Sequence, residues 1–578
     1  MSRLKKILET LPELGVEFDA FGRAGRVVAH TDGSEFVRKV TACRQRLRGG
    51  LRGSEVGGGK AVGLLFRPEE TIEFLVAAFA AIAEGFAVVP LYPNWSEVSQ
   101  TDYLRAYKIR SLLIGRSYRS RTSAWRDSVI DEAVVIALDT LETPDEVEPF
   151  PELPPDRPCA YIFTSGTSGT IAKLTEISMA NLDAAIQNIE ELEFLYPGMT
   201  LHSPLSTSHI FAFVVVLGFL AIRPGRLIFS DIQYLSRLPQ SATGPVGGLI
   251  LVPVVLNRIR AGFYEKLVTH WRRDAVPQEY RKLARIPLGV RRGLKRLLAR
   301  AEEACIELET HGRIGARGAA AIQVVRRLLG RRIRERLGSP DFVVVGGAKP
   351  NLRAMAFLEV MGVRVLQGWG MTETTGPLAV CSLRDRFSGA FGTCGKLFDS
   401  TTATLEDGEL VVGGPQVARG YLEAGGRFVP FDGTKRTGDY AEFDTTGRLR
   451  ILGKASDRIT TENGLNYNPV PIEERLLADD LEAEQRFEEI VVLGDGQPRL
   501  GVVIFLRESA DAGESTQAYA KALLMEFNRR QVVDERLEIW SIAAEKFNDA
   551  ELLGPSGKIV RRRAEAKYAS MFPSAVTH

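Results

Sequence analysis

The chain has 578 residues, of which 45% are hydrophobic and 25% are charged, and its formal net charge at pH 7 is only +2. These values are typical of a folded protein with about three or four structural units, and they exclude a protein that binds nucleic acid through its overall charge. The five cysteines are scattered and include no Cys-x-x-Cys pair, which favours a reducing compartment and argues against a structural zinc site.

Neither the first residues nor the longest apolar run predicts a targeting or membrane-spanning segment. Residues 1–9 carry charges throughout, without an apolar core. The longest apolar run, Ile210–Ile222, has thirteen residues, fewer than the roughly 20 that a membrane span needs. We expect a buried helix there and a cytoplasmic enzyme, with peripheral contact to a membrane left open.

Residues 61–114 alternate between strand and helix patterns. We predict strands at Ala61–Phe66, Phe86–Tyr92 and Ser111–Ile114, separated by helices at 68–83 and 98–107. This alternation indicates βαβ units and therefore a parallel sheet.

An apolar strand end at Tyr161–Phe163 opens into a loop, Thr164–Gly169, that is rich in glycine and hydroxyl side chains. Glycine lets backbone N–H groups turn toward an anion, and Ser or Thr hydroxyls add uncharged donors, so the loop suits polyphosphate. Its spacing is neither the Walker arrangement nor the dinucleotide fingerprint. The alternative is an ordinary surface loop of Ser, Thr and Gly.

A helix predicted from Met179 to Glu193 is followed by His209, directly before the apolar run. Taken alone, one histidine is more often a core residue bonded to the backbone than a functional one.

Residues 271–336 carry 18 Arg and Lys against 7 Asp and Glu, on sequence that favours helices. The excess indicates either a solvated helical face or a surface for an anionic membrane, an acidic carrier protein or the phosphates of CoA. The residues that we expect to carry such binding are Arg291, Arg292, Lys295 and Arg296.

A second βαβ unit is predicted from 341 to 366, and it leads into Gln367–Gly376. Two glycines, Gly368 and Gly370, flank Trp369, which suits a flat ring pressed against backbone. Glu373 follows a buried strand, where a carboxylate needs a compensating charge such as a divalent cation.

Residues 391–452 contain short alternating runs that predict a small β structure, such as a distorted barrel. Within it lies Arg436–Asp439. One carboxylate can accept hydrogen bonds from both hydroxyls of a ribose, although an Asp after Gly is more often part of a simple turn. Near the C-terminus, Lys558 lies in a glycine-containing segment and is either a mobile cation or a solvated lysine beside a basic tail.

Together these motifs resemble the adenylate-forming superfamily of acyl-CoA synthetases, luciferases and peptide-synthetase adenylation domains, and most closely the long-chain acyl-CoA synthetases. The signature Thr-Ser-Gly-Thr-Thr-Gly-x-Pro-Lys is matched by Thr164–Gly169, but the segment up to Lys173 has one extra residue and no proline. The Tyr-Gly-x-Thr-Glu pattern has Trp369 in place of Tyr, and Arg-Thr-Gly-Asp is matched at 436–439.

The resemblance implies an α/β fold. Residues 1–453 would form a large domain of two doubly wound sheets and a small distorted β-barrel, and residues 454–578 a smaller, mobile α+β domain carrying Lys558. The family has Arg where this chain has Lys454, and an Asp or Lys hinge residue where it has Ser456.

The resemblance also implies a nucleotide site. Its members would be Thr164, Ser165, Gly166, Thr167, Ser168, Gly169, Lys173, Gly346, Gly347, Ala348, Gly368, Trp369, Gly370, Asp439 and Lys454. The 164–169 loop would hold pyrophosphate, Trp369 and the 346–348 turn would border adenine, and Asp439 would bind the ribose.

Four further residues would act on the reacting groups. By resemblance, Lys558 would bridge the substrate carboxylate and the α-phosphate, Thr372 would contact that phosphate, and Glu373 would hold Mg²⁺. His209 would lie near the mouth of the acyl pocket.

The implied reaction is activation of a fatty or other hydrophobic carboxylic acid by ATP and Mg²⁺, followed by transfer to CoA. The alternatives are a ligase that loads the phosphopantetheine of an acyl carrier protein, which would use the basic 271–336 segment, and a homologue that binds nucleotide without turnover.

Overall fold

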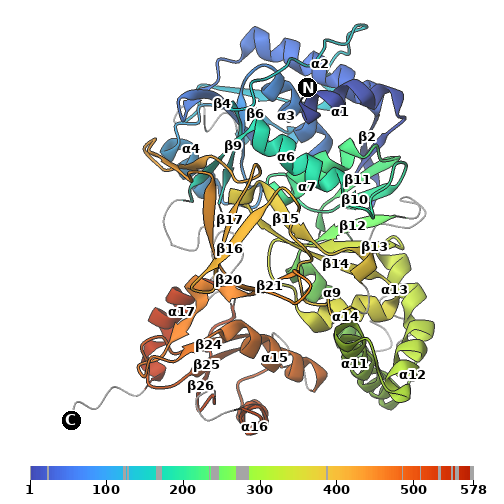
Figure 1. The fold of residues 1–578 in the computed structure, drawn as a ribbon, viewed down its shortest axis with the longest axis vertical. Coiled ribbons are helices and arrows are strands. Elements are labelled where there is room, and N and C mark those ends of the chain that lie inside the picture. Colours follow the sequence, from blue (N-terminus) through green and yellow to red (C-terminus); the bar gives the residue numbers. More distant parts are fainter. Residues whose placement is uncertain are drawn as a thin grey trace.

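The computed structural model describes residues 2–22, 25–121, 125, 129–164, 172–232, 235, 246–268, 285–385, 388–483, 486–507, 510–531, 536–547, 551–552 and 559–572. Two large sheets, a small four-stranded sheet and a C-terminal unit make up this part of the chain (Figure 1). The mixed α/β class predicted from the sequence is confirmed.

The first large sheet has nine strands in the order β19-β18-β9-β8-β5-β4-β6-β7, with β3 paired to β4. Its strands are β3 (Ser54–Val56), β4 (Gly59–Leu65), β5 (Ala87–Pro90), β6 (Ser111–Ile114), β7 (Glu132–Val135), β8 (Pro158–Phe163), β9 (Leu174–Ser178), β18 (Gly420–Leu422) and β19 (Phe428–Pro430). The strands from β8 to β7 in this order run parallel, joined by helices α3 (Thr71–Ala83) and α4 (Glu97–Ala106), as the alternating pattern predicts.

The second sheet has eight strands in the order β15-β14-β13-β12-β10-β11-β1-β2. They are β1 (Glu17–Phe21), β2 (Val27–Asp32), β10 (Thr200–Ser203), β11 (Arg226–Ser230), β12 (Gly248–Leu251), β13 (Phe342–Val345), β14 (Arg364–Met371) and β15 (Gly376–Val380). The six inner strands run parallel, and the edge strands β2 and β15 run antiparallel to their neighbours.

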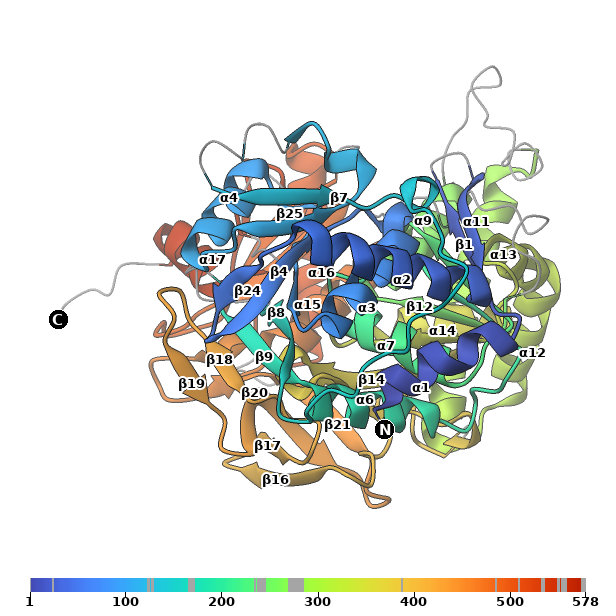
Figure 2. The ribbon, with the colours of Figure 1, turned by 90° about the horizontal axis from the view of Figure 1, so that it is seen from above.

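Apolar helices fill the space between the two sheets. Helices α1 (Arg3–Thr10), α2 (Gly33–Gly50), α3, α6 (Met179–Glu190) and α7 (Ile210–Ala221) share one core with strands of both sheets, and Figure 2 shows α3 and α7 between β4 and β12. Helix α7 is the predicted apolar run, and ten of its residues, such as Phe213 and Leu217, are buried. Among the described helices, none has the length and apolar character that crossing a bilayer requires.

A second helical layer covers the far side of the eight-stranded sheet. It consists of α9 (Pro253–Val268), α11 (Leu288–His311), α12 (Ala316–Val325), a π-helical turn (Arg326–Gly330), α13 (Arg331–Arg336) and α14 (Leu352–Met361), which share a core with β12, β13 and β14. Its centre holds a buried ion pair, in which Arg260 Nη2 lies 2.7 Å from Glu302 Oε2.

This layer corrects part of the prediction for the basic segment. Arg291 and Lys295 are buried and donate to the backbone carbonyls of Ile286 and Ala483, so they cannot form an exposed surface for a partner. Arg292 and Arg296, on the same helix, are exposed. Counting charges along the sequence could not separate the two pairs, because burial depends on which face of α11 packs inward.

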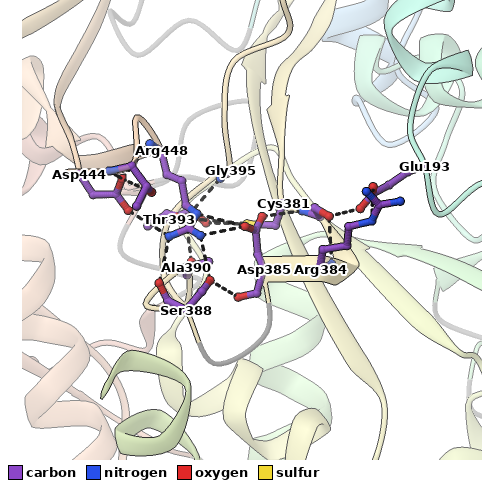
Figure 3. A network of polar contacts seen from close by, with 12 residues as sticks. Glu193, Cys381, Arg384, Asp385, Ser388, Ala390, Thr393, Gly395, Asp444 and Arg448 are labelled. Carbon is purple, nitrogen blue, oxygen red and sulfur yellow. Dashed lines mark hydrogen bonds and ion pairs between the residues drawn. The ribbon is translucent and has the colours of Figure 1, made fainter. Parts of the chain in front are cut away.

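The small β structure predicted at 391–452 takes the form of a four-stranded antiparallel sheet, β16-β17-β20-β21. Its strands are β16 (Thr402–Glu406), β17 (Glu409–Gly413), β20 (Thr434–Phe443) and β21 (Leu449–Lys454). Arg448, at the start of β21, fastens this sheet to the segment after β15. Its Nη2 lies 3.0 Å from Asp385 Oδ1, and its Nη1 donates to Ser388 O at 3.0 Å (Figure 3).

The C-terminal unit lies below the small sheet in Figure 1 and has cores of its own. It contains β22 (Ile459–Thr460), β23 (Asn466–Tyr467), α15 (Pro469–Glu482), β24 (Phe487–Leu493), β25 (Gly501–Leu506), α16 (Glu514–Arg529), β26 (Ile539–Ile542) and α17 (Arg561–Tyr568). A buried ion pair joins α15 to α17, with Glu473 Oε1 2.7 Å from Arg561 Nη1.

Removing one partner of this buried pair should destabilise the C-terminal unit. In Glu473→Ala the Arg561 charge stays buried without its partner, so we expect the opening free energy of β24 and β25 to fall by about 3–5 kcal/mol. The matched control is Glu526→Ala, which removes exposed pairs with Arg529 and Arg530 and should cost far less, because solvent screens such pairs. Hydrogen exchange followed by mass spectrometry measures the opening free energy of β24 and β25 in each variant. An equal decrease in the two variants would contradict the role given to the buried pair.

Candidate functional site

Glu373 is held in a tight turn at the end of the eight-stranded sheet. The 3₁₀ turn Thr372–Thr374 directly follows β14, and the Thr374 hydroxyl accepts from the N–H of Met371 and donates to the carbonyl of Gly376 at 2.8 Å. The next residue, Thr375, adopts a left-handed conformation with φ 49°, which reverses the chain into β15. The turn fixes the direction in which the Glu373 side chain leaves the sheet.

The Glu373 carboxylate is buried, with 7% of the residue exposed, and its contacts come from a distant segment. The Tyr421 hydroxyl donates to Glu373 Oε1, and the Ala418 N–H donates to the Glu373 carbonyl at 2.9 Å. Because Tyr421 lies on β18, which pairs with β9, this contact ties the end of the eight-stranded sheet to the nine-stranded one.

The glycine- and hydroxyl-rich loop connects the antiparallel strands β8 and β9. The N–H of Thr164 donates to the carbonyl of Lys173 at 2.8 Å, which closes the base of this hairpin. Lys173 Nζ lies 2.8 Å from Glu423 Oε1 and 5.1 Å from the centre of the Tyr421 ring. Lys173, at the base of the hairpin, therefore lies beside the tyrosine that binds Glu373.

Several predicted residues lie outside the part of the chain that the structure describes. They are Ser165, Gly166, Thr167, Ser168, Gly169 and Lys558.

Asp439 lies on the inner face of β20 with 5% of the residue exposed. Its Oδ2 accepts a hydrogen bond from the indole N–H of Trp369 at 3.0 Å, and its Oδ1 lies 2.8 Å from Lys454 Nζ. The register of β20 against β21 sets Lys454 directly opposite Asp439. Three residues predicted to serve one nucleotide site are thus in direct contact.

The glycines of the site permit close approach of backbones. A Cβ added to Gly370 would lie 2.1 Å from the carbonyl oxygen of Gly376, so the pairing of β14 with β15 requires a glycine there. A Cβ on Gly368 would lie 3.3 Å from the Ala379 carbonyl oxygen.

The 346–348 turn follows β13, at the same edge of the sheet as the turn after β14. Gly347 has φ +87°, a conformation that side chains disfavour, and it is exposed together with Ala348. A Cβ on Gly346 would meet the Phe211 ring at 3.0 Å. The exposed backbone of this turn lies between the sheet edge and the start of α7.

His209 is the N-cap residue of α7 and stays accessible to solvent, yet enough protein surrounds the ring that burial lowers its pKa to about 4. Its ring centre lies 4.3 Å from that of Tyr92, and Tyr92 and Trp95 are in edge-to-face contact at 4.7 Å. The Tyr92 hydroxyl donates to the carbonyl of Phe163, the last residue of β8, at 3.1 Å. Tyr92 and Trp95 thus form an aromatic wall beside the His209 ring.

Sequence reasoning missed Tyr421, Tyr92 and Trp95, which hold or line the site. Tyr421 lies 48 residues from Glu373 in sequence, and no spacing rule relates a tyrosine on a three-residue strand to a distant turn. The run Leu91–Trp95, which overlaps the end of the predicted strand Phe86–Tyr92 and follows β5 in the structure, carries the signal that could have found the aromatic wall, because ligand sites gather at the carboxyl ends of parallel strands.

Comparison with known proteins gives the same picture. A family model described as AMP-binding enzyme matches residues 37–422, and one described as AMP-binding enzyme C-terminal domain matches residues 456–575. The long-chain-fatty-acid–CoA ligase FadD15 of Mycobacterium bovis is 26% identical over 467 residues, which are 76% of this chain and 72% of that protein. The chloroplastic long-chain-fatty-acid–[acyl-carrier-protein] ligase AEE15 of Arabidopsis thaliana is 27% identical over 42% of this chain and 37% of its own.

Among solved structures, the ATP-bound MatB of Rhodopseudomonas palustris superposes with a TM-score of 0.68 at 17% identity, covering 99% of this chain and 100% of its own. At this identity the likeness shows the shared fold.

The depressed pKa of His209 can be tested directly. Burial disfavours the imidazolium, so the ring should stay neutral from pH 8 down to about pH 5. NMR of the histidine ring signals, with His209→Gln to identify the signal, should show no titration near pH 6.5, where an unperturbed histidine titrates. The unfolded chain binds this proton at a higher pH than the folded chain, so acidification through this interval favours unfolding. Titration of the His209 signal near pH 6.5 would contradict the enclosed position.

Proposed function

Because the chain belongs to the AMP-binding enzyme family, we propose that it activates a fatty or other hydrophobic carboxylic acid with ATP, giving acyl-AMP and pyrophosphate, and then transfers the acyl group to CoA. The observation that carries the proposal is the presence of two buried carboxylates around the end of β14: Glu373, whose partner Tyr421 contacts Lys173 at the base of the hydroxyl-rich loop, and Asp439, which is bonded to Trp369. This set suits a ligand that combines a sugar with a phosphate chain.

The chemistry explains why no side-chain nucleophile is needed. A carboxylate resists nucleophiles because it is negative and lacks a good leaving group. In the proposed reaction its oxygen attacks the α-phosphorus of ATP, the bond to the β-phosphate oxygen breaks, and pyrophosphate leaves. The thiol of CoA then attacks the acyl carbon and AMP departs. Catalysis of both steps rests mainly on positioning and on stabilising charge.

We assign the nucleotide contacts as follows. Asp439 would accept hydrogen bonds from the ribose, and Trp369 with the exposed 346–348 turn would border adenine. Thr372 would contact the α-phosphate. The Thr164–Gly169 loop, followed by Lys173, would hold the departing pyrophosphate, and Lys558 would bridge the substrate carboxylate and the α-phosphate.

The Glu373 turn fits a magnesium ion that arrives with the nucleotide. Mg²⁺ is usually bound by one or two carboxylates together with substrate phosphates, and Glu373 offers one buried carboxylate with its Oε1 held by Tyr421. The described residues contain no group of three or more His, Cys, Asp or Glu arranged to hold an ion by themselves. Bound there, the ion would neutralise phosphate charge.

The acyl chain would bind beside His209. The aromatic wall of Tyr92 and Trp95 and the apolar helix α7 make this part of the site suited to a hydrophobic acid. The similarity to proteins named as long-chain-fatty-acid ligases supports the same substrate class.

We also propose that residues 1–453 form the domain that binds ATP and the acid, and that 454–578 form the mobile domain that delivers Lys558. Lys454 closes β21 and precedes the short turn Ala455–Asp457, which contains Ser456. A short exposed turn between two separately packed units is a suitable hinge.

An acyl carrier protein is the alternative acceptor. The exposed Arg292 and Arg296 on α11 offer positive charge to an acidic partner, and a relative named as an acyl-carrier-protein ligase supports this possibility.

The adenylation step is tested by pyrophosphate release. With ATP, Mg²⁺ and a panel of short, long and aromatic acids, the protein should release pyrophosphate with a hydrophobic class, measured with hydroxylamine as the trap. Lys558→Ala should lower this rate at least a hundredfold without unfolding the chain, because the bridging charge is lost. Full activity of the variant would remove Lys558 from the mechanism. ATP binding without pyrophosphate release for any acid would favour a homologue that binds nucleotide without turnover.

The acceptor is tested by AMP release from preformed acyl-AMP. Free CoA should support release without any carrier protein. If a carrier is the acceptor, the double variant Arg292→Glu and Arg296→Glu should raise its KM about tenfold, because the charges that attract an acidic partner are reversed. The variant Lys521→Glu, on exposed α16, serves as the control. An unchanged KM would exclude this face of α11 as the carrier site.

A further inference from the structure

Lys435 is a lysine at the edge of the site to which no motif assigns a role. It is the second residue of β20 and is partly buried. Its Nζ lies 5.2 Å from the centre of the Tyr421 ring and 5.0 Å from that of Phe431. Tyr421 is the residue whose hydroxyl holds Glu373. The Lys435 ammonium group, which contacts the Tyr421 and Phe431 rings, therefore lies on the side of β20 that faces the Glu373 turn.

The strand geometry relates Lys435 to Asp439. Lys435, Thr437 and Asp439 are the less exposed positions at the start of β20, and between Arg436 and Tyr440 the strand bulges away from regular pairing with β17, where Gly438 has φ 70°. Four residues of an extended strand span at most about 13 Å, so the two side chains are no farther apart along β20 than that. A ligand that binds Asp439 through its ribose and extends along β20 would bring its far end to Lys435.

Two lysines approach the same ring from different parts of the chain. Lys173, at the base of the hydroxyl-rich loop, lies 5.1 Å from the centre of the Tyr421 ring, and it has Glu423 as its partner. Lys435 forms no ion pair and donates no hydrogen bond among the residues that the structure describes.

The electrostatic surroundings of Lys435 favour an anion. Burial lowers the pKa of Lys435. The nearby carboxylates of Glu373 and Glu409 oppose this shift, whereas the positive charges of Lys454 and Lys173 lower the pKa further. An ammonium group that is partly removed from water and repelled by two other cations is stabilised by a negative ligand placed among them.

We propose that Lys435 is a further phosphate-binding residue of this site, which contacts the β- and γ-phosphates of ATP and the pyrophosphate that forms from them. The assignment rests on the proposed function, because it takes Asp439 as the ribose-binding residue. Lys435 would approach the phosphate chain from β20 of the small sheet, and Lys173 from the position directly before β9 of the nine-stranded sheet. Glu373 would lie beside the same phosphates.

The test uses the full chain with Lys435→Gln, which removes the charge and keeps most of the length, and with Lys435→Arg, which restores the charge. The exposed Lys521→Gln is the matched control. Binding of tripolyphosphate, ATP and adenosine is measured by calorimetry, and KM for ATP and for the acid by pyrophosphate release.

Lys435→Gln should weaken tripolyphosphate and ATP binding about tenfold and raise the KM for ATP to match, since a hydrogen bond to a charged group is lost. Adenosine affinity and the KM for the acid should not change. Lys435→Arg should recover most of the affinity, and Lys521→Gln should behave as the wild type. A uniform loss that includes adenosine would indicate a structural defect and would overturn the proposal.

Equal affinity of the wild type and Lys435→Gln for tripolyphosphate would overturn the role of Lys435 alone. Wild-type binding of ATP without pyrophosphate release for any acid would overturn the proposed reaction, and the tripolyphosphate comparison would still decide the role of Lys435. A wild type that binds neither ATP nor tripolyphosphate would overturn both.

Discussion

The arrangement of the site depends on one constraint, the need to satisfy the buried carboxylate of Glu373. A charge removed from water is costly unless it is paired and hydrogen-bonded. Here a tyrosine hydroxyl from β18 binds the carboxylate, and an N–H from the same segment binds the backbone of the turn. Because β18 pairs with β9, the loop hairpin of one large sheet is fixed against the end of the other.

The same constraint operates at Asp439, with a different solution. Its partners are an indole N–H from β14 and an ammonium group from β21, so the small sheet is fixed to the eight-stranded sheet through the carboxylate itself. The two acidic residues thus join three sheets at one place. The polar contacts that would bind a nucleotide are also contacts that hold the layers together.

Much of the architecture could be predicted because it follows from local patterns. The βαβ units at 61–114 and the apolar helix at Ile210 each have a distinct signal in the sequence, and the structure contains the expected elements. Contacts between distant segments have no such signal. The burial of Arg291 and Lys295, the hydroxyl of Tyr421 on Glu373 and the position of Lys435 depend on how layers pack, which neither periodicity nor charge counting reports.

The occupied carboxylate of Asp439 is still compatible with a ribose. A carboxylate offers about four lone-pair positions, and Trp369 and Lys454 each use one of them, on different oxygens. Two positions remain, which is the number that two ribose hydroxyls require. The Trp that replaces the usual Tyr donates to this carboxylate through its indole N–H, so it fixes the direction in which the free lone pairs point. The departure from the family pattern at Trp369 is therefore consistent with sugar binding, because the indole orients the Asp439 carboxylate that would accept hydrogen bonds from the ribose.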